Sequence, residues 1–579
     1  MKTLYISDLD GTLLNPDAEI SVETAQVLNR LFREGVQFTV ATARTLATTA
    51  QILTPVNIKL PIVLMNGAAI YDANTKKYIR TENLDHSKAV EIIETFQKYG
   101  LSPLMYTIHD DSMSTYFEPP ITNLMQRYID LRKMRYGKGF HETKSLKETC
   151  QNESVYFSTL GPKEALDAVA KALQHIEGVQ VEFYRDVYSD TIWMEEIWFL
   201  EVFKGNASKE SAVQFLKKAF GFEKVISFGD NYNDIPMFRA SDERYAVGNA
   251  REEVKAAATA VIGTNAENGV AQWLDRQLTR KWFKGNLHCH STLSDGRESP
   301  EERIRQYRDR GYDFLSLTDH NVYGTTAYAL PDDFLLIPGV ERDVFVTGET
   351  FKVFHLIGFE GADGGAPYAP GEHIEKLAWQ GMETVQQLID EMKSHGNIVF
   401  LAHPIWSRNE LSDIIALEGL TGVEVYNHNC DMESNDGLSE VYWDSLLRRG
   451  RPVWGFGVDD THVEQDKFGG WIMVKAQALT VSAIAEAIQT GHFYASAGPE
   501  LVDFYVENQT VFVSCSPASR INFVMYDTHG HSCFAKDTPL TEAQHKLRGT
   551  ETYVRVEIVD ALGKKAWSNP IFLDQAEDL

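Results

Sequence analysis

The sequence predicts an α/β protein of several domains, and three observations lead to this prediction. With 579 residues, the chain exceeds what one hydrophobic core commonly organises, so three or more structural units are expected. Strand patterns alternate with helix patterns up to about residue 498, which is typical of parallel sheets covered by helices. From about residue 500 the helical period stops, and strands separated by turn residues predict a small antiparallel domain.

The first strand and helix patterns predict a doubly wound sheet. TLYISDL is a short apolar run with a β-branched residue, and SVETAQVLNRLFREG places Val22, Ala25 and Leu28 at helical spacing between a serine and a glycine. VQFTVAT and PIVLMNG follow as further strands. We therefore predict a core over 1–82 and 191–276, an α/β insertion over 83–190, a third alternating series over 281–499 and the β-domain over 500–579.

Composition limits the partners and the compartment. Apolar residues make up 43 %, no apolar stretch approaches the ~18 residues of a membrane span, and the start lacks the apolar run of a signal peptide. Five scattered cysteines without a CxxC pair indicate a reducing compartment. We expect a cytoplasmic protein that does not bind membranes.

Net charge argues against one class of partner. The charge is −27, from 82 acidic and 55 basic residues, and no basic run occurs. Phosphate contacts dominate the affinity of nucleic-acid binders, so long nucleic acid is a poor partner, whereas small phosphorylated metabolites and nucleotides remain possible. Some carboxylates are candidates to bind divalent metals. The sequence predicts no oligomeric state.

A pair of aspartates follows the first predicted strand. SDLDGTLL puts Asp8 and Asp10 at the carboxyl end of a parallel strand, where open α/β sheets bind ligands. Alternation places both on one side, so that one can attack phosphorus while the other donates and recovers a proton.

Further polar residues follow later strands in the same region. Thr42, at the end of VATAR, can bond a phosphoryl oxygen, and Lys209, in NASKES, can neutralise phosphate charge. In GDNYND, Asp230 and Asp234 suit Mg²⁺ and can fix the lysine, and Asn233 between them is a candidate to bind substrate.

These motifs, in this order, resemble the haloacid dehalogenase superfamily, and the Cof-type sugar-phosphate phosphatases in particular, over about residues 1–276. The resemblance implies a Rossmann-like core with a cap where residues 83–190 lie. It implies the following roles: nucleophile Asp8, acid/base Asp10, phosphate ligands Thr42 and Lys209, and Mg²⁺ ligands Asp8, Asp10 through its carbonyl, and Asp230. The lysine is usually followed by glycine in that family; here Glu210 follows, and Lys204 is a competing candidate.

A second set of polar residues begins with NLHCHSTLSDG. On a strand, His288 and His290 point to one face and Cys289 to the other, so the cysteine is predicted to pack rather than to bind metal. Further candidates stand at or near later strand ends: Asp319, His320, Glu341, His355, His403, Asp460 and His462. Strand ends of a closed α/β barrel converge on one rim. Such ligands suit Zn²⁺, Mn²⁺ or Fe²⁺, and their number suggests two or three ions, with Glu341 as a bridge.

This order resembles the PHP (polymerase and histidinol phosphatase) metallohydrolases, which form a distorted (β/α)7 barrel. Carried over by motif, one ion has ligands His288, His290, Glu341 and Asp460, a second has Glu341, His355 and His403, and a third has Asp295, His320 and His462. Many relatives have a histidine at the position of Asp295. The spacing in DDTH favours Asp460 but also permits Asp459. His428 either reaches substrate phosphate or caps a loop; Arg408 and Arg342 have weaker claims, and a surface ion pair is expected of Arg342.

The tail narrows the second resemblance. GHFYASAGP, followed by a strand segment with KAWSNP, looks like the carbaryl-hydrolase-like branch of the PHP superfamily, over about 284–573. Trp567 is expected to be a core anchor. The leading interpretation is a bifunctional hydrolase of small phosphorylated compounds. The alternatives are carbamate or amide cleavage by the second domain, or a binding or regulatory role for one domain.

Overall fold

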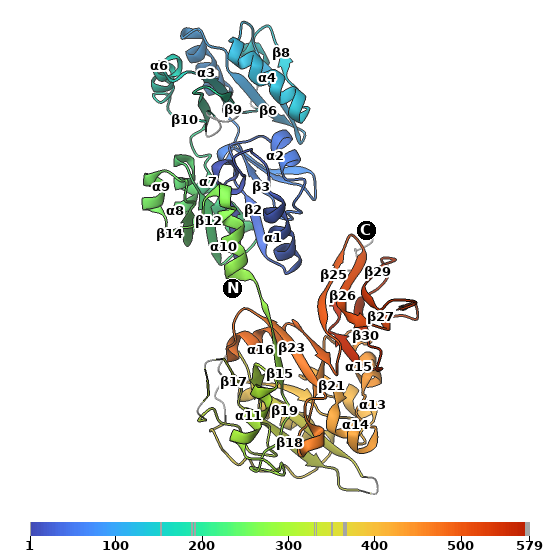
Figure 1. The fold of residues 1–579 in the computed structure, drawn as a ribbon. Helices are drawn as coiled ribbons and strands as arrows, with labels where there is room; N and C mark the ends of the chain where they lie inside the picture. The colour runs from blue at the N-terminus through green and yellow to red at the C-terminus, as the bar shows by residue number, and fades with distance from the viewer. Residues whose placement is uncertain are drawn as a thin grey trace. The chain divides into compact units, whose positions relative to one another are not determined.

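The computed structural model describes residues 2–150, 153–186, 189, 193–328, 330–331, 333–348, 351–362 and 368–573. The chain forms two compact units, Met1–Thr279 and Arg280–Leu579, each with its own sheets and helices (Figure 1). Over the described ranges, no helix has the length and apolar character needed to cross a membrane.

The first unit is organised around a parallel sheet with the strand order β14-β13-β12-β1-β2. The strands are β1 (Thr3–Ser7), β2 (Gln37–Val40), β12 (Lys224–Gly229), β13 (Glu243–Ala246) and β14 (Ala260–Val261). The helices are α1 (Val22–Arg33), α2 (Leu46–Ile52), α7 (Lys209–Ala219), α8 (Ile235–Arg239), α9 (Glu252–Ala257) and α10 (Gly269–Leu278). The predicted Rossmann-like α/β core is confirmed. Parallel pairing brings the carboxyl ends of β1, β2 and β12 to one edge.

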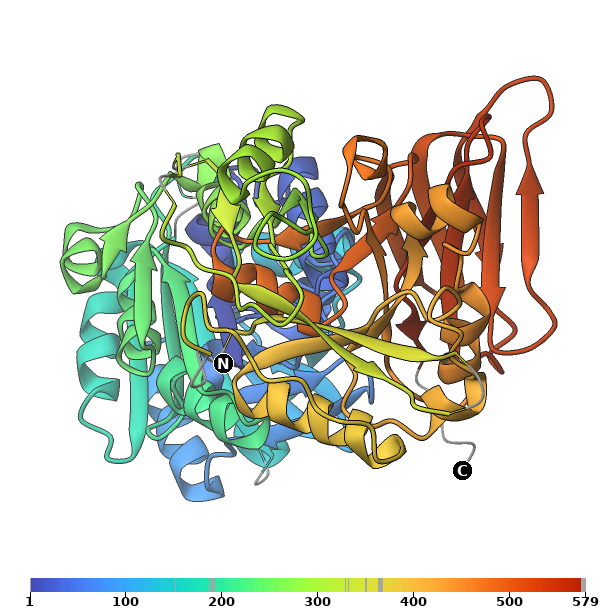
Figure 2. The same ribbon diagram turned by 90° about the horizontal axis from the view of Figure 1, so that it is seen from below.

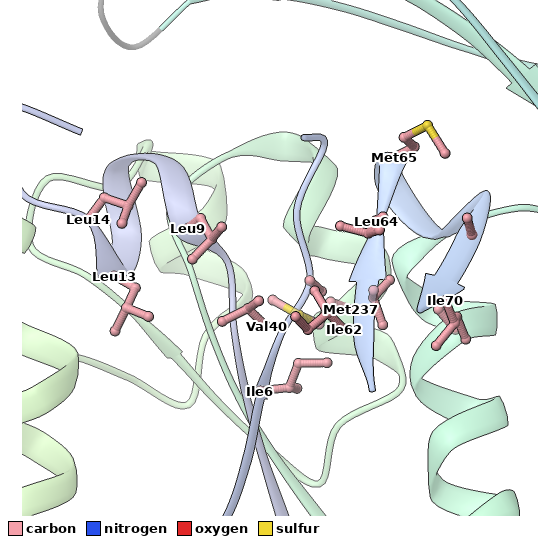
Figure 3. Packing of buried hydrophobic residues seen from close by; sticks show 14 of the residues in the cluster. Ile6, Leu9, Leu13, Leu14, Val40, Ile62, Leu64, Met65, Ile70 and Met237 are labelled. Carbon is pink, nitrogen blue, oxygen red and sulfur yellow. The ribbon is translucent and has the colours of Figure 1, made fainter. Parts of the chain in front are cut away.

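Local sequence explains how this core forms. α1 begins where the Ser21 side chain accepts the backbone N–H of Thr24 at 3.0 Å. Ile6 and Val40 are fully buried in a core to which the strand β3 (Ile62–Leu64) and the turns η1 (Leu9–Leu13) and η2 (Met65–Gly67) also contribute (Figure 3). A small sheet of β3, β4 (Ala69–Asp72) and β5 (Lys77–Thr81) leads into the insertion. The turns η4 (Tyr232–Asp234) and η5 (Asn265–Glu267) follow later.

The insertion forms its own sheet with the order β10-β11-β9-β6-β7-β8. Its strands are β6 (Leu104–His109), β7 (Ser112–Phe117), β8 (His141–Glu142), β9 (Ser154–Gly161), β10 (Val179–Arg185) and β11 (Trp198–Lys204). Its helices are α3 (His86–Lys98), α4 (Asn123–Tyr136), α5 (Leu146–Thr149) and α6 (Lys163–Leu173). β11 pairs with both β9 and β10 and buries Leu200 and Val202. The insertion therefore continues to Lys204, beyond the predicted end at residue 190.

In the second unit, one mixed sheet has the order β18-β19-β20-β21-β22. Its strands are β18 (Gly339–Phe345), β19 (Val353–Glu360), β20 (Asn397–Leu401), β21 (Gly422–Asn427) and β22 (Trp454–Val458). The strand β19 runs antiparallel to both neighbours, while β20, β21 and β22 pair in parallel. Isolated bridges join His320 to Glu341 and Cys289 to Thr461, so both edges of this sheet meet segments that follow strands of a second sheet. The seven-unit barrel stays a prediction.

That second sheet has ten strands in the order β17-β16-β15-β23-β24-β31-β30-β27-β28, with β32 beside β30. They are β15 (Lys281–Asn286), β16 (Phe314–Leu315), β17 (Leu335–Leu336), β23 (Trp471–Ala476), β24 (Phe493–Ser496), β27 (Arg520–Met525), β28 (His531–Phe534), β30 (Tyr553–Val559), β31 (Lys565–Ser568) and β32 (Ile571–Phe572). A three-stranded sheet holds β25 (Leu501–Glu507), β26 (Thr510–Ala518) and β29 (Leu540–Lys546). The helices are α11 (Pro300–Asp309), α12 (Met382–Ser394), α13 (Leu411–Ile415), α14 (His428–Ser434), α15 (Glu440–Leu447) and α16 (Val481–Gln489), with the turn η6 (Glu464–Asp466).

The last strands gather at one side of the second unit (Figures 1 and 2). They are antiparallel, as predicted for residues 500–579. However, β31 pairs with β24 as well as with β30, so this segment continues a sheet that begins at Lys281. Trp567 on β31 is buried against residues of β21 and β24, which agrees with its predicted role as a core anchor.

Candidate active sites

Three aspartates meet beyond the carboxyl ends of β1 and β12. Asp8 follows β1, Asp230 follows β12 and Asp234 ends η4; one oxygen of each lies within 4.8 Å of the others. All three are buried. The turn after Asp8 requires Gly11, since its φ is +81° and a Cβ there would lie 2.6 Å from Oδ2 of Asp230. The fold therefore brings together three carboxylates that the sequence analysis proposed for Mg²⁺.

Lys209 is buried among these carboxylates at the start of α7. Its Nζ lies 2.5 Å from Oδ1 of Asp8 and 2.7 Å from Oδ1 of Asp234. Oδ2 of Asp234 accepts the backbone N–H groups of Asp230 and Asn231 at 2.9 and 3.1 Å. Asp234 therefore holds both the lysine and the loop that carries Asp230.

Lys204, the competing lysine, and Glu210, which stands where the family usually has glycine, each face a partner outside this group of aspartates. Lys204 is partly exposed, and its Nζ lies 4.0 Å from Glu82. The Glu210 carboxylate forms an ion pair with Arg239 of α8 at 2.9 Å. Since Glu210 already has a cationic partner, it adds little negative charge to the site.

Asp10 and Thr42 both contact Arg44, a residue that the sequence analysis missed. The Arg44 guanidinium donates to both carboxylate oxygens of Asp10, from Nε at 2.7 Å and from Nη2 at 2.5 Å. Oγ1 of buried Thr42 accepts the backbone N–H of Arg44 at 3.1 Å. The position of Arg44 in VATAR, directly after Thr42 and Ala43, was a signal that could have identified it.

Asn233 links the core to the insertion. Its Nδ2 donates to Oδ1 of Asn66 at 3.1 Å, and Nδ2 of Asn66 donates to Oε2 of Glu201 on β11 at 3.0 Å. Asn233 also lines the pocket in front of Asp8, so it can both position Asn66 and face a ligand.

Burial and crowding perturb the ionisation of this cluster. Burial raises the pKa of Asp8 to about 8, although Lys209 opposes the shift. Burial, together with Asp234 and Asp8, raises the pKa of Asp230 well above its usual range. Lys209 has a raised pKa despite its burial, because Asp234 and Asp8 favour its charged form. Buried oxygen donors that outnumber their cationic partner fit a hard divalent cation such as Mg²⁺.

A pocket with a volume of about 100 Å³ opens in front of Asp8. The core contributes Asp8, Asp10, Ala43, Arg44, Asn231 and Asn233, and the insertion contributes Tyr128, Arg132, Tyr184, Asp186, Phe199 and Glu201. A ligand bound at Asp8 would therefore contact both. Burial raises the pKa of Glu201 to about 7.

In the second unit, Glu341 lies at the centre of a buried cluster of imidazoles and carboxylates. Its Oε2 is 3.3 Å from Nε2 of His288 and 3.1 Å from Nε2 of His290. Oδ1 of Asp460 lies 3.1 and 3.2 Å from the same two nitrogens. These distances bring together the four residues that the sequence analysis assigned to one ion.

The other oxygen of Glu341 faces a different pair of histidines. Oε1 lies 2.6 Å from Nδ1 of His355 and 3.4 Å from Nε2 of His403. His403 also groups with His288 and Asp460. Glu341 thus contacts two neighbouring groups of donors, as a bridging carboxylate would.

The third predicted group lies at the exposed side of the cluster. Asp295 approaches His462 at 3.4 Å and His320 at 3.6 Å. His290 joins this group, with Nδ1 at 3.6 Å from Asp295. The residues expected to bind the third ion were Asp295, His320 and His462. In the structure His290 belongs to this group as well as to the residues expected to bind the first ion.

The two aspartates of DDTH have different surroundings. Asp459 accepts the backbone N–H groups of Phe468, Gly469 and Gly470 and the hydroxyl of Tyr307. Its oxygens are therefore used in fixing the loop, whereas the Asp460 carboxylate faces the histidines. The geometry supports Asp460 of the two alternatives. The Cys289 side chain packs in an apolar cluster, on the face opposite the histidines, as expected.

Three weaker candidates lie outside the cavity. Nδ1 of His428 is 3.2 Å from the Tyr426 hydroxyl, and the contact of this histidine with a substrate phosphate stays a prediction. Arg408 forms an ion pair with Asp436. The expected surface position of Arg342 is wrong: it is 1 % exposed and its Nη1 is 3.0 Å from Glu391.

Glu424 was missed by the sequence analysis. It is fully buried in β21, and Oε1 lies 2.7 Å from Nδ1 of His288. Oε2 accepts the backbone N–H of His403 at 2.7 Å and Nδ2 of Asn427 at 2.9 Å. Such a carboxylate turns Nε2 of His288 toward the cluster. A glutamate inside the apolar run GVEVYN was the available signal.

The cluster fits divalent metal ions. Buried Glu341 Oε1, Asp460 Oδ1 and His320 Nδ1 form no hydrogen bond within the described structure. Burial alone would raise the pKa of Glu341, yet His320, His355 and His288 hold it well below its usual range. Imidazole and carboxylate donors with unsatisfied atoms directed at one another suit Zn²⁺, Mn²⁺ or Fe²⁺.

A cavity of about 440 Å³ exposes this cluster. Its lining consists of Asp295, His320, Glu341, His355, His403, Trp406, Asn429, Met432, Glu433, Asp460, His462, Val463, Gln465 and Asp466. The ligands meet here because His288, His320, His403 and Asp460 follow strand ends, while Glu341 and His355 lie within β18 and β19.

Comparison with known proteins identifies the first unit. The haloacid dehalogenase-like hydrolase family matches residues 5–274. The N-terminal half therefore carries a phosphatase domain of this superfamily, of the Cof type, and the chain is a hydrolase.

Individual relatives match the same half. Pyridoxal phosphate phosphatase YbhA of Escherichia coli is 28 % identical over 275 residues, which are 47 % of this chain and 97 % of the relative. Phosphatase YwpJ of Bacillus subtilis is 28 % identical over 302 residues, covering 48 % of this chain and all of the relative. A solved haloacid dehalogenase-like hydrolase from B. subtilis has 27 % identity and a TM-score of 0.40, covering 48 % of this chain and 100 % of that one.

Proposed function

We propose that the chain is a bifunctional, metal-dependent hydrolase of small phosphorylated compounds, a phosphomonoesterase in the first unit and a phosphoesterase in the second. The observation that carries the proposal is the convergence of two separate donor sets, around Asp8 and around Glu341, each on its own cavity. Relatives of the first unit named for pyridoxal phosphate and for 5-amino-6-(5-phospho-D-ribitylamino)uracil support small phosphorylated substrates there.

In the first site, Asp8 is the proposed nucleophile. Its carboxylate attacks phosphorus, the bond from phosphorus to the leaving oxygen breaks, and Asp10 protonates that oxygen. Water then attacks phosphorus of the aspartyl phosphate, Asp10 recovers a proton, and the bond to Asp8 breaks. Lys209 and Thr42 hold phosphoryl oxygens, and Arg44 orients Asp10. Mg²⁺ held by Asp8, Asp230 and the Asp10 carbonyl would balance the phosphoryl charge.

In the second site, the proposed ligands are the nine residues of the metal cluster: His288, His290, Asp295, His320, Glu341, His355, His403, Asp460 and His462. Two or three divalent ions bound there would supply Lewis acidity toward the ester and toward water. Glu341 bridges two donor groups, and Glu424 holds His288 and the backbone of His403 in place.

Two substitutions test the bifunctional proposal. Asp8→Asn should abolish phosphomonoesterase activity at the first site and leave hydrolysis at the second site, and His290→Ala should do the reverse. Both variants are assayed on nitrophenyl phosphate and on bis(nitrophenyl) phosphate, with added Mg²⁺ or Mn²⁺. If either substitution alone abolished every activity, two independent sites would be the wrong description.

A second candidate for the second site is cleavage of a carbamate or amide. The apolar residues Trp406, Met432 and Val463 in the lining favour it, because they can accommodate an uncharged acyl compound. An aryl carbamate compared with nitrophenyl phosphate, both in the Asp8→Asn protein, separates the two. Faster turnover of the carbamate would favour this candidate.

A further inference from the structure

The two cavities differ in their cationic side chains. Arg44 and Arg132 line the pocket of the first unit, and Lys209 lies beside Asp8. The described lining of the second cavity contains no lysine or arginine, although it is about four times as large, with 440 Å³ against 100 Å³. Among the described lining residues, only the imidazoles, and metal ions that they would hold, can supply positive charge to a ligand in the second cavity.

Next to the proposed metal ligands, the wall of the second cavity at α14 carries an acidic residue. Glu433 on α14 lies in the lining, exposed, close to the indole of Trp406. A ligand group that extends from the metal cluster toward α14 meets this carboxylate. A second anionic group on the ligand would be repelled by Glu433, and the described lining holds no lysine or arginine to offset that repulsion.

The same side carries an apolar surface made by Trp406, Met432 and Val463. The Trp406 ring centroid is 5.1 Å from that of His403 and 6.1 Å from that of His355, so the indole borders the proposed ligands directly. Its Nε1 donates to Oε2 of Glu433 at 3.1 Å, which fixes the ring. Met432 is 56 % exposed, and a methionine adapts well to a planar ligand.

We propose that the second cavity accepts esters whose leaving group is uncharged and apolar or aromatic, packed on Trp406, and whose only charged group is the one held at the metal cluster. This inference rests on the proposed hydrolytic function of the second unit. Compounds that carry a further carboxylate or phosphate on the leaving group are poor ligands. The first site, with Arg132 at the insertion side, does not share this restriction.

A matched pair of substrates tests the proposal. The full-length Asp8→Asn protein, loaded with Mn²⁺, is assayed on phenyl phosphate and on 4-carboxyphenyl phosphate, which differ by one carboxylate on the same ring. The expected kcat/KM is about tenfold higher for phenyl phosphate. Calorimetry with phenylphosphonate and 4-carboxyphenylphosphonate, which are not hydrolysed, should show the same order in Kd.

Substitutions identify the residues responsible. Glu433→Lys should lower the ratio of kcat/KM for phenyl phosphate to kcat/KM for 4-carboxyphenyl phosphate severalfold, and Glu433→Gln should lower this ratio less. Glu542→Lys, on the exposed face of β29, should leave the ratio unchanged. Trp406→Leu should lower kcat/KM for phenyl phosphate more than for methyl phosphate, which has no ring to pack on the indole.

Different outcomes would contradict the preference for an uncharged leaving group and the proposed hydrolytic function of the second unit. Equal kcat/KM and equal Kd for the matched pair, or a ratio unaffected by Glu433→Lys, would overturn the inference and leave the phosphoesterase intact. If no ester were hydrolysed and neither phosphonate bound, the proposed function of this cavity would be wrong, and the inference would fall with it.

Discussion

Glu201 shows how one buried carboxyl group connects the insertion to the first site. It is 5 % exposed, accepts from Asn66 at 3.0 Å and lines the pocket in front of Asp8. Burial raises its pKa from 4.5 to about 7, against the hydrogen bonds of Tyr156 and Tyr184, which favour the charged form. The folded protein therefore binds a proton at Glu201 under conditions in which the unfolded chain releases it.

The raised pKa of Glu201 predicts that the free energy of unfolding decreases as pH rises. Between about pH 4.5 and pH 7 the folded state holds the proton and the unfolded state does not, so the stabilisation is present below pH 4.5 and is lost as pH rises toward 7. Full loss corresponds to about 3 kcal/mol. Glu201→Gln should remove this dependence, as measured by urea unfolding at pH 5 and pH 8. Glu177→Gln, at an exposed site of the insertion, is the control; an unchanged pH dependence in Glu201→Gln would contradict the assignment.

In the second site, the buried carboxylate of Glu424 contacts the proposed metal ligand His288 from outside the cavity lining. Glu424→Gln should weaken metal binding by about 10–100-fold, because His288 would lose the carboxylate that orients it. Metal content after dialysis and titration with Mn²⁺ measure the effect. Glu433→Gln, at the cavity side, should keep the affinity of the unmodified protein. Equal affinities in both variants would show that Glu424 does not position His288.

At the scale of single elements, sequence patterns predicted well where helices and strands form, but predicted poorly which strands pair with one another. The apolar runs before Asp8 and Thr42 and the amphipathic period of Val22–Arg33 correspond to β1, β2 and α1, because each is determined within a few residues. The predicted bounds ended the insertion at residue 190 and so placed Trp198–Lys204 in the core, whereas β11 pairs with β9 and β10 of the insertion. Which sheet a strand joins depends on pairing distant in sequence.

In the candidate sites too, residues whose position depends on local structure were predicted, and residues whose role depends on distant segments were not. Residues at strand ends, such as His320 and His403, were found because parallel topology alone predicts that they converge. Arg44, Glu424 and the insertion residues around Asp8 were missed, because their roles depend on side-chain direction and on contacts between distant segments. Arg342 was placed at the surface because a charged residue inside a strand gives no sign of the partners, Glu391 and Asn321, that permit its burial.

The strand β31 joins the last segment of the chain to the rest of the second unit, and Trp567 is its largest buried side chain. Trp567→Ala should destabilise this unit by about 3–5 kcal/mol, through lost burial and a remaining cavity. In a denaturant titration, the transition of the second unit should move and that of the first should stay. Trp567→Phe should recover part of the loss. A change below about 1 kcal/mol would mean that residues 500–573 do not depend on this contact.

At the scale of the whole molecule, two units of nearly equal length carry donor sets of different chemistry. The first offers the oxygens of Asp8, Asp230 and Asp234 beside Lys209, and the second adds imidazoles to Glu341, Asp295 and Asp460. Oxygen donors suit Mg²⁺, and imidazoles suit Mn²⁺, Zn²⁺ or Fe²⁺. The proposed bifunctional hydrolase would therefore depend on a different metal for each of its two proposed activities.

This difference predicts selective recovery after metal removal. Treatment of the full chain with a chelator should abolish both activities, since both sites are proposed to need bound cations. Added Mg²⁺ should restore the activity that depends on Asp8, and added Mn²⁺ or Zn²⁺ should be required for the activity that depends on His290. Calorimetry gives a second readout, because a metal at about 100 times its Kd stabilises the unit that binds it by about 2.7 kcal/mol. In the Asp8→Asn and His290→Ala proteins, each metal should stabilise the unit with the intact site. Full recovery of both activities with Mg²⁺ alone would contradict the proposed difference between the two sites.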